Sequence, residues 1–341
     1  MSALRLLLGR LRQDRLPALL IIVLVFVTAL LAAAAPRLFT RTADAGLRFE
    51  VAQASVLERN LQLGRITRIQ AAAGEGMAPI DEVEASIEEA LPESVRRIVT
   101  GGSTLAKSIS YAVLDRPATR PGFITLQFQD RLGDEVELVG GRMPSGETRR
   151  VPAPDLPPGS VPVPENRLGL LFEVALSTAT AEELGVGIGD VMHMIPDQDD
   201  ALVGAFGFPE AVAVEVVGLV EVTHPDADFW VGDRGLHEPS LEPVGINIVL
   251  VHATALASPD AYPAILELDA PLRYSFRYYP DPERLHAGML DRLLVDLRRM
   301  EASYASFATQ PDETTTTLRT GLLGLAERYL AERRSSEAIL T

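Results

Sequence analysis

Residues 16–35 form a run of twenty residues without a single charged side chain. At ~1.5 Å per residue a helix of this length spans ~30 Å, which matches the hydrocarbon core of a bilayer. The run therefore predicts a transmembrane helix and makes the lipid bilayer the first expected partner of the chain. This feature constrains the fold most, because the rest of the chain must fold as a body tied to a membrane.

Two other interpretations of this run stay open at this point. A cleavable signal peptide would use Ala33, Ala34 and Ala35 as its small-residue cleavage site, but its apolar core is usually only ~7–15 residues long. A helix buried in the core of the protein is the third interpretation. The length of the run favours an uncleaved anchor.

The charges around the run predict its orientation. Four arginines and one aspartate precede it: Arg5, Arg10, Arg12, Arg15 and Asp14. Because basic flanks stay on the cytoplasmic side, residues 1–15 are expected inside and everything after Ala35 outside. The sequence thus predicts a single-pass protein of the cell membrane, with a cytoplasmic N-terminus and an extracytoplasmic body.

Composition excludes several kinds of site. Cysteine is absent, which excludes disulfides, thiolate metal sites and cysteine nucleophiles. The net charge is −16, and residues after 41 carry 25 basic and 46 acidic side chains, so the body repels phosphate backbones and no nucleic-acid partner is expected. Lys107 is the one lysine, and no phosphate-binding loop of the ATPase type occurs.

Hydrophobic periodicity predicts mixed α/β structure after the anchor. We expect helices at 44–59, 79–91 and 178–184, and strands at 61–69, 108–114, 123–130, 172–176, 190–195, 211–220, 246–252 and 272–279. Residues 151–164 contain six prolines and are expected to be an irregular hinge or surface loop. The polar stretch 197–200 is expected to be a hairpin tip.

The end of the chain predicts long helices. Asp281 and Pro282 form a helix start, and an apolar stripe then extends from Leu285 to Tyr304. After a polar break at 310–317, a second stripe predicts a helix at 318–338. We expect these helices, at 281–306 and 318–338, to bundle with the helix at 44–59 close to the membrane.

These elements define an α+β fold with one N-terminal transmembrane helix, a mixed α/β extracytoplasmic region and long C-terminal helices forming a membrane-proximal stalk. The expected divisions are a cytoplasmic segment at 1–15, the membrane helix at 16–35, a stalk helix at 36–60, the α/β region at 61–280 and a helical stalk at 281–341. The α/β region is expected to be one or two lobes, with the hinge near 151–164.

Candidate chemistry is sparse. The polar stretch 224–233 alternates carboxylates with His224 at its start, but it lacks the calcium-loop pattern, so we expect a solvated loop with Trp230 as its packing anchor. Gly185, Gly187 and Gly189 follow a helix and precede a strand, the reverse of a dinucleotide site, so we expect them to form a helix C-cap and a turn. Gly140 and Gly141 before Arg142 fit a tight turn with positive φ, and Gly218 fits a bulge or close contact. No serine-hydrolase elbow or zinc-protease motif occurs, although glycosidase-type carboxylate pairs stay open. We predict no catalytic, cofactor-binding or metal residues, and no enzyme.

Four short patterns occur in order along the chain. They are the basic segment with its anchor, V-G-G-R-M-P at 139–144, V-A-L-S followed by a short helix and G-I-G-D at 174–190, and V-E-V-V-G-L-V at 214–220. Together these patterns resemble the extracytoplasmic region of MacB/FtsX-like ABC-transporter permeases. The resemblance covers most of the chain and implies a non-catalytic domain, with no cofactor. Such a domain serves export or mechanotransmission and is driven by a separate ABC-type ATPase subunit.

The same resemblance implies further permease segments or subunits as partners. Such permeases continue into additional membrane helices, and no second apolar run comes after Ala35 in this sequence. We therefore expect a truncated or split permease subunit, or a single-anchor relative. The alternative is a membrane-tethered extracytoplasmic binding or adhesion module without an ATPase partner.

Overall fold

The structure is a computed structural model that describes residues 15–114, 121–152, 168–197, 199–200, 203, 210–244, 248–269, 271–306 and 316–339. The predicted segment before residue 15, most of the proline-rich stretch 151–164 and most of the polar break 310–317 lie outside these residues. The division of the α/β region into lobes with a hinge at 151–164 therefore stays a prediction.

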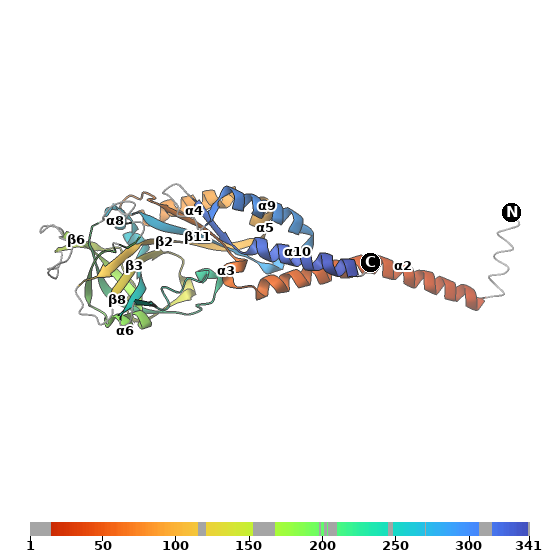
Figure 1. Cartoon of the computed structure of the whole chain (residues 1–341), viewed down its shortest axis with the longest axis horizontal. Helices are drawn as coiled ribbons and strands as arrows, with labels where there is room; N and C mark the ends of the chain where they lie inside the picture. The colour runs from red at the N-terminus through yellow and green to blue at the C-terminus, as the bar shows by residue number, and fades with distance from the viewer. Residues whose placement is uncertain are drawn as a thin grey trace.

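Helix α2 (Arg15–Gln53) is one continuous helix of 39 residues that begins in the apolar run and ends inside the body (Figure 1). Its apolar side chains from Leu19 to Leu31 are exposed, and none of the most apolar 18-residue window is buried. A helix that is apolar on all sides and exposed is typical of a membrane span. The core-helix interpretation is therefore wrong. Helix α2 is long enough and apolar enough to cross a bilayer.

Beyond α2, thirteen strands of the described residues pair into one sheet. Its path runs β12-β13-β1-β11-β2-β3-β10-β6-β8-β4, while β5 pairs with β6, β7 with β2 and β8, and β9 with β10. The bounds are β1 Leu61–Thr67, β2 Val99–Val113, β3 Gly122–Gln129, β4 Val136–Gly141, β5 Thr148–Pro152, β6 Leu168–Ser177, β7 Val191–Pro196, β8 Val212–Val222, β9 Ser240–Val244, β10 Ile248–Ala257, β11 Leu272–Pro280, β12 Ala305–Ser306 and β13 Thr316–Thr320.

The double pairing of β7 closes part of this sheet into a barrel. The ring passes through β2, β3, β10, β6, β8 and β7 and returns to β2. It forms the end of the molecule farthest from the start of α2 (Figure 1). Strand β2 belongs to both the barrel and the rest of the sheet, because its first half pairs with β11 and its last residues pair with β7. Strands β11, β1 and β13 continue the sheet beyond the barrel, and we call them the sheet extension. This extension connects the barrel to the helices.

Helices cover one face of this extension. They are α4 (Ala78–Ala90), α5 (Glu93–Ile98), α9 (Leu290–Ser303) and α10 (Leu322–Ile339), while α6 (Thr178–Leu184) and α8 (Tyr262–Leu266) pack on the barrel. Alternation decides which face they cover, because Leu272, Tyr274, Phe276 and Tyr278 of β11 are all buried beneath the helices or in the barrel core. The expected mixed α/β content and the C-terminal helices are confirmed.

Local predictions based on glycine chemistry are also confirmed. Gly141 has φ +71°, and Gly185 ends α6 in the left-handed conformation with φ +63°. Gly218 lies opposite Gly141 beside a β-bulge, and a Cβ on it would lie 2.2 Å from the Arg142 carbonyl oxygen. The close approach of two backbones thus explains why glycine is needed at 218.

The predicted helix at 281–306 is wrong in its first third. Asp281 does cap a turn, η4 (Pro282–Arg284), by accepting from the Glu283 amide at 2.8 Å. The chain is extended at Leu285 and His286, and a second turn, η5 (Ala287–Met289), leads into α9. The reason is tertiary: the Leu285 carbonyl and the Ala287 amide bond to side chains of α2, which replaces the bonds a helix would make.

The second predicted helix also begins too early. Residues 316–320 form strand β13 beside β1, with Leu318 buried at 9% exposure, and α10 starts only at Leu322. The run of threonines before Leu318 favours a strand because β-branched side chains fit a pleated sheet. The two helices have 14 and 18 residues, so they span ~21 Å and ~27 Å.

The buried face of α9 gives a first prediction. Leu293 is 2% exposed in the core, whereas the Arg298 side chain is 60% exposed and contacts Glu327 at the surface. Leu293→Ala should lower the free energy of unfolding by about 2–5 kcal/mol, and Arg298→Ala should change it by no more than about 0.5 kcal/mol. Denaturant unfolding of the full chain in detergent measures both, and similar losses for the two variants would contradict the assigned face.

Candidate functional site

Helix α2 enters the folded body at a cluster of contacts that we call the joint, comprising residues 43–59, 283–287 and 321–329. Within it, α2 buries one narrow face through Leu47 and Val51, which are 1% and 3% exposed. These two residues are four apart, so they lie on the same side of the helix. The same helix that is exposed all round in its apolar run is thus held by the body in its last turns.

Polar bonds fix α2 to the extended turn before α9. The Arg48 guanidinium pairs with Glu283 at 2.8 Å and donates to the Leu285 carbonyl at 3.3 Å. One turn earlier, the Asp44 carboxylate accepts from the Ala287 amide at 2.8 Å. Because these bonds hold backbone atoms, sliding or rotating α2 would break bonds on which the fold of this turn depends.

Helix α10 runs along α2 in the opposite direction, and its last described turn lies beside α2 (Figure 1). The Tyr329 hydroxyl donates to the Ala43 carbonyl at 2.6 Å, and its ring packs 3.7 Å from where a Cβ on Gly46 would lie. On its other side α10 meets α9, where Arg298 pairs with Glu327 at 2.7 Å. The expected bundle of these three segments is therefore present.

A short helix, α3 (Val56–Arg59), continues the joint toward the sheet. Ser55 and Glu58 form a reciprocal capping box at its start. At its end, Arg59 and Asn60 both donate to the Asp228 carboxylate, at 2.8 and 2.7 Å. Helix α2 is thereby connected through α3 to the loop at residues 224–236.

That loop is anchored in the body as expected, although by more than its tryptophan. Trp230 is 1% exposed in a small core with Val220, Leu236 and Leu256. Asp233 accepts from Lys107 at 2.7 Å and from Arg277 at 2.9 Å. Burial alone would raise the pKa of Asp233, but these two cations and a backbone bond lower it to about 2.

The carboxylates of this loop do not converge. Asp226 is 83% exposed and pairs with Arg234, Asp228 faces Arg59, and Asp233 points toward the sheet. Among the residues that the structure describes, no group of three histidine or carboxylate side chains is placed to hold a metal ion. His224 is exposed at the edge of the loop.

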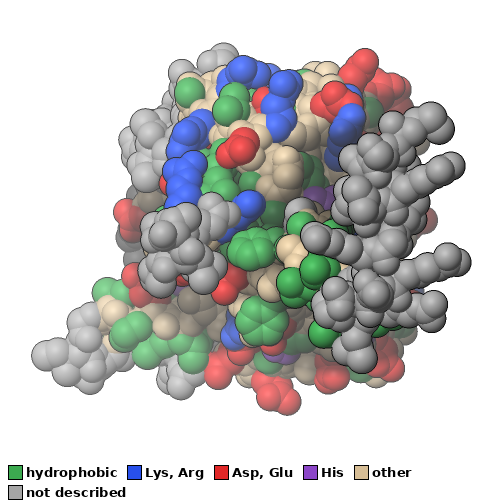
Figure 2. All heavy atoms as spheres, turned by 90° about the vertical axis from the view of Figure 1, so that its right-hand side faces the viewer, with side chains coloured by type: hydrophobic (Ala, Val, Ile, Leu, Met, Phe, Trp, Pro, Cys, Tyr) green, Lys and Arg blue, Asp and Glu red, His purple; other side chains and the backbone are tan. Residues whose placement is uncertain are grey.

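Figure 2 looks at the molecule from the side on which α2 leaves the body, and there hydrophobic side chains lie near the middle with Lys and Arg side chains gathered above them. A groove of about 400 Å³ runs between α2 and α10, lined by Leu38, Phe39, Thr42, Ala43, Tyr329, Glu332 and Arg333. Exposed apolar residues such as Leu38 (61%) and Phe39 (55%) lie directly beyond the apolar run. This end of the body is amphipathic, as a surface close to a bilayer requires.

The sequence predicted which helices meet in the joint, but it did not predict the hydrogen bonds and ion pairs that hold them. The partners of Asp44, Arg48 and Tyr329 lie more than 200 residues away and leave no local signal. Sequence reasoning also overlooked Lys107 and Arg277 as partners of Asp233. A signal for the latter exists, because Arg273, Ser275 and Arg277 alternate with the buried aromatic residues of β11.

Two glycines at the start of α10 give a second prediction. A Cβ on Gly321 would lie 2.7 Å from the Cα of Glu58, whereas one on Gly324 would meet only the flexible end of Arg328 at 3.7 Å. Gly321→Ala should therefore destabilise the chain by about 1–3 kcal/mol, and Gly324→Ala should stabilise it by about 0.5–1 kcal/mol. Opposite shifts in denaturant midpoint are expected; shifts of the same sign would show that α3 and α10 are not in contact.

Comparisons with known proteins give a limited result. No protein-family model matches the chain, and neither does any curated protein. Among solved structures, the periplasmic region of MacB from Actinobacillus actinomycetemcomitans is 6% identical over 77% of this chain and 88% of its own, with a TM-score of 0.31. A domain attributed to a permease protein from Porphyromonas gingivalis is 12% identical over 78% and 93%, with a TM-score of 0.26. Scores this low carry no weight for function, which must instead be inferred from the contacts within this chain.

Proposed function

We propose that this chain is the extracytoplasmic domain of an ABC-permease-like complex, anchored by α2, and that the joint transmits movement between the membrane and the body. The observation that carries the proposal is the continuity of α2, which extends without a break from an exposed apolar run into a buried, hydrogen-bonded seat. A rigid helix held at both ends passes displacement on instead of absorbing it. The domain itself has no catalytic role in this proposal.

The return of α10 supports the same function. The chain leaves the membrane through α2 and comes back along it, with Tyr329 bonded to Ala43. A domain inserted between membrane segments of a permease needs this arrangement, because both of its ends must reach the bilayer at one place. The uncleaved anchor, the cytoplasmic N-terminus and the extracytoplasmic body belong to the proposal, as does an ABC-type ATPase on the cytoplasmic side.

The joint also suggests what moves. A pull or tilt of α2 acts first on Asp44 and Arg48, which hold the turn before α9, and then through α3 on Asp228. The two connections lead to different places, the first to the helical layer and the second to the loop at 224–236. A tilt of the membrane helix would therefore shift these two parts of the body against each other.

Cross-linking tests this proposal, because the chain has no cysteine to interfere. A Gly46→Cys/Tyr329→Cys variant places thiols on facing sides of α2 and α10, where a short bismaleimide locks them together. The tagged full chain, stabilised by chemical cross-linking in its own membrane, should be isolated with an ABC-type ATPase whose vanadate-sensitive hydrolysis falls several-fold on locking. The two single-cysteine variants, treated with the same reagent, are the matched controls.

Two results would contradict the proposal. The first is the isolation of the chain without any ABC-type ATPase, which would favour a tethered binding or adhesion module. The second is an ATPase whose hydrolysis is the same in locked and single-cysteine preparations, which would show that the joint transmits no movement.

A further inference from the structure

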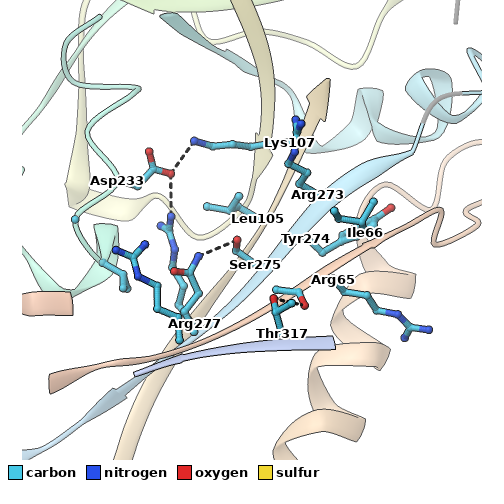
Figure 3. Close-up of a pocket in the computed structure, with 15 residues that line it drawn as sticks. Arg65, Ile66, Leu105, Lys107, Asp233, Arg273, Tyr274, Ser275, Arg277 and Thr317 are labelled. Atoms are coloured by element: carbon cyan, nitrogen blue, oxygen red, sulfur yellow. Dashed lines mark hydrogen bonds and ion pairs between the residues drawn. The ribbon is translucent and has the colours of Figure 1, made fainter. Parts of the chain in front are cut away.

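A cavity of about 440 Å³ lies on the face of the sheet extension opposite the helical layer (Figure 3). Its floor is formed by β13, β1, β11 and β2, and the segment Val231–Asp233 forms one wall. The register places Lys107 beside Arg273, and Gln62 beside both Arg277 and Arg319. These side chains therefore share one face of the sheet, while their neighbours along each strand enter the core.

Five cations line the cavity, and four of them share this face, where they pair with only two carboxylates. Arg65 is opposite Tyr274 in the register and so belongs to the other face of β1. Lys107 and Arg277 share the single carboxylate of Asp233, as the dashed lines of Figure 3 show. Arg273 pairs with Asp200 at 2.7 Å. Arg319 forms no ion pair with any residue in the part of the chain that the structure describes. The four cations on this face thus exceed their carboxylates by two positive charges, in a chain whose net charge is −16.

Arg277 provides an independent sign that the cavity needs an acceptor. Its side chain is 1% exposed, and its two terminal nitrogens donate to the Phe229 carbonyl at 3.1 Å and to Asp233. Its Nε is buried and has no acceptor among the described residues. A guanidinium carries five N–H donors, and burying it with unmet donors is costly unless a ligand supplies charge or hydrogen bonds.

We propose that this cavity is a binding site for a small organic oxyanion, a carboxylate or a phosphate monoester, with a polar body. The cations surround the anionic head, since guanidinium and ammonium groups are the usual partners of such oxygens. Ser275, Thr317 and Gln62 supply hydroxyl and amide groups for the body, and Leu105 and Ile66 supply apolar contact. The volume is within the range of small-ligand sites and exceeds the needs of a bare inorganic ion.

Trp230 makes the site testable, because it is the one tryptophan and lies in the loop that carries Asp233. The full chain in detergent is titrated with succinate, glucose 6-phosphate and inorganic phosphate, following Trp230 fluorescence and binding heat, with glucose as the neutral control. We expect saturable binding of at least one organic anion, weaker binding of inorganic phosphate and no response to glucose. Succinate and glucose 6-phosphate distinguish the carboxylate from the phosphate ester.

Variants decide whether binding occurs in this cavity. Arg319→Gln removes an exposed cation without an ion pair, so the fold is retained, and it should weaken binding about tenfold or more. Arg319→Lys should restore most of the affinity, and Arg298→Gln, an exposed arginine on α9, should leave it unchanged. Equal melting temperatures confirm folding. The proposal is overturned by the absence of any millimolar response to the three anions, by equal affinity in Arg319→Gln, or by equal binding of glucose.

Discussion

Replacing Asp233 with alanine should cost about 3–5 kcal/mol of unfolding free energy, because it leaves two cations without their shared carboxylate. The Arg277 side chain is 1% exposed and that of Lys107 is 20% exposed. Water can therefore hardly solvate the charge of Arg277. The loss should also release the loop at 224–236, which Asp233 holds to the sheet. Denaturant unfolding of the full chain in detergent measures the change, and Asp226→Ala, whose side chain is 83% exposed, should stay within about 0.5 kcal/mol.

The same carboxylate predicts how stability depends on pH. Its pKa is about 2 in the folded chain and 3.8 as a reference, so the folded state favours the ionised form. The contribution of Asp233 is therefore complete above about pH 4 and is lost as the pH falls through 2. Asp233→Asn should lose this acid-sensitive component. A variant with the acid profile of the unmodified chain would show that Asp233 is not the group that titrates.

Trp230→Ala should cost a similar amount, about 3–5 kcal/mol, through loss of a large buried side chain. Trp230 is 1% exposed and packs edge-on to Phe229, with ring centroids 4.9 Å apart. The cavity left behind would lie between the barrel and the loop that reaches α3 through Asp228. Circular dichroism is the suitable probe, since the variant has no tryptophan fluorescence.

Two matched variants serve as controls for the stability loss expected of Trp230→Ala. Trp230→Phe keeps most of the buried surface and should lose clearly less than the alanine variant. His224→Ala, at an exposed position of the same loop, should be silent within about 0.5 kcal/mol. If alanine at 230 were no worse than alanine at 224, the tryptophan would not be the anchor of this loop.

Elements set by local chemistry were predictable from the sequence. The predicted starts of β11, β3 and α6 lie within one residue of the observed starts, because alternation marks the strands and the glycines after residue 184 mark the end of the helix. The anchor and its continuation were also predictable, because hydrophobic length and helical periodicity are local properties. The pairing of α2 with α10 followed from the need of a one-sided apolar stripe for a partner.

The features that sequence reasoning missed depend on distant contacts. The start signal at Asp281 is real, yet α9 begins nine residues later because Arg48 and Asp44 take the backbone groups of the turn. Closure of the barrel depends on β7 pairing with both β2 and β8, which no periodicity reveals. The cationic cavity assembles from four strands, with Lys107 from β2, Arg273 and Arg277 from β11 and Arg319 from β13, and the pattern within one strand gives no warning of the cations on the others.

The central claim is that α2 anchors an extracytoplasmic body, and single-cysteine labelling tests it most directly. In the cysteine-free chain, Asp226→Cys places a thiol on an exposed part of the body and Ser2→Cys places one before the anchor. Cells with a permeable outer envelope and an intact cell membrane are treated with a membrane-impermeant maleimide. The account predicts labelling at 226 at once and at 2 only after the membrane is lysed. Labelling at 2 with protection at 226, or protection of both until lysis, would contradict it.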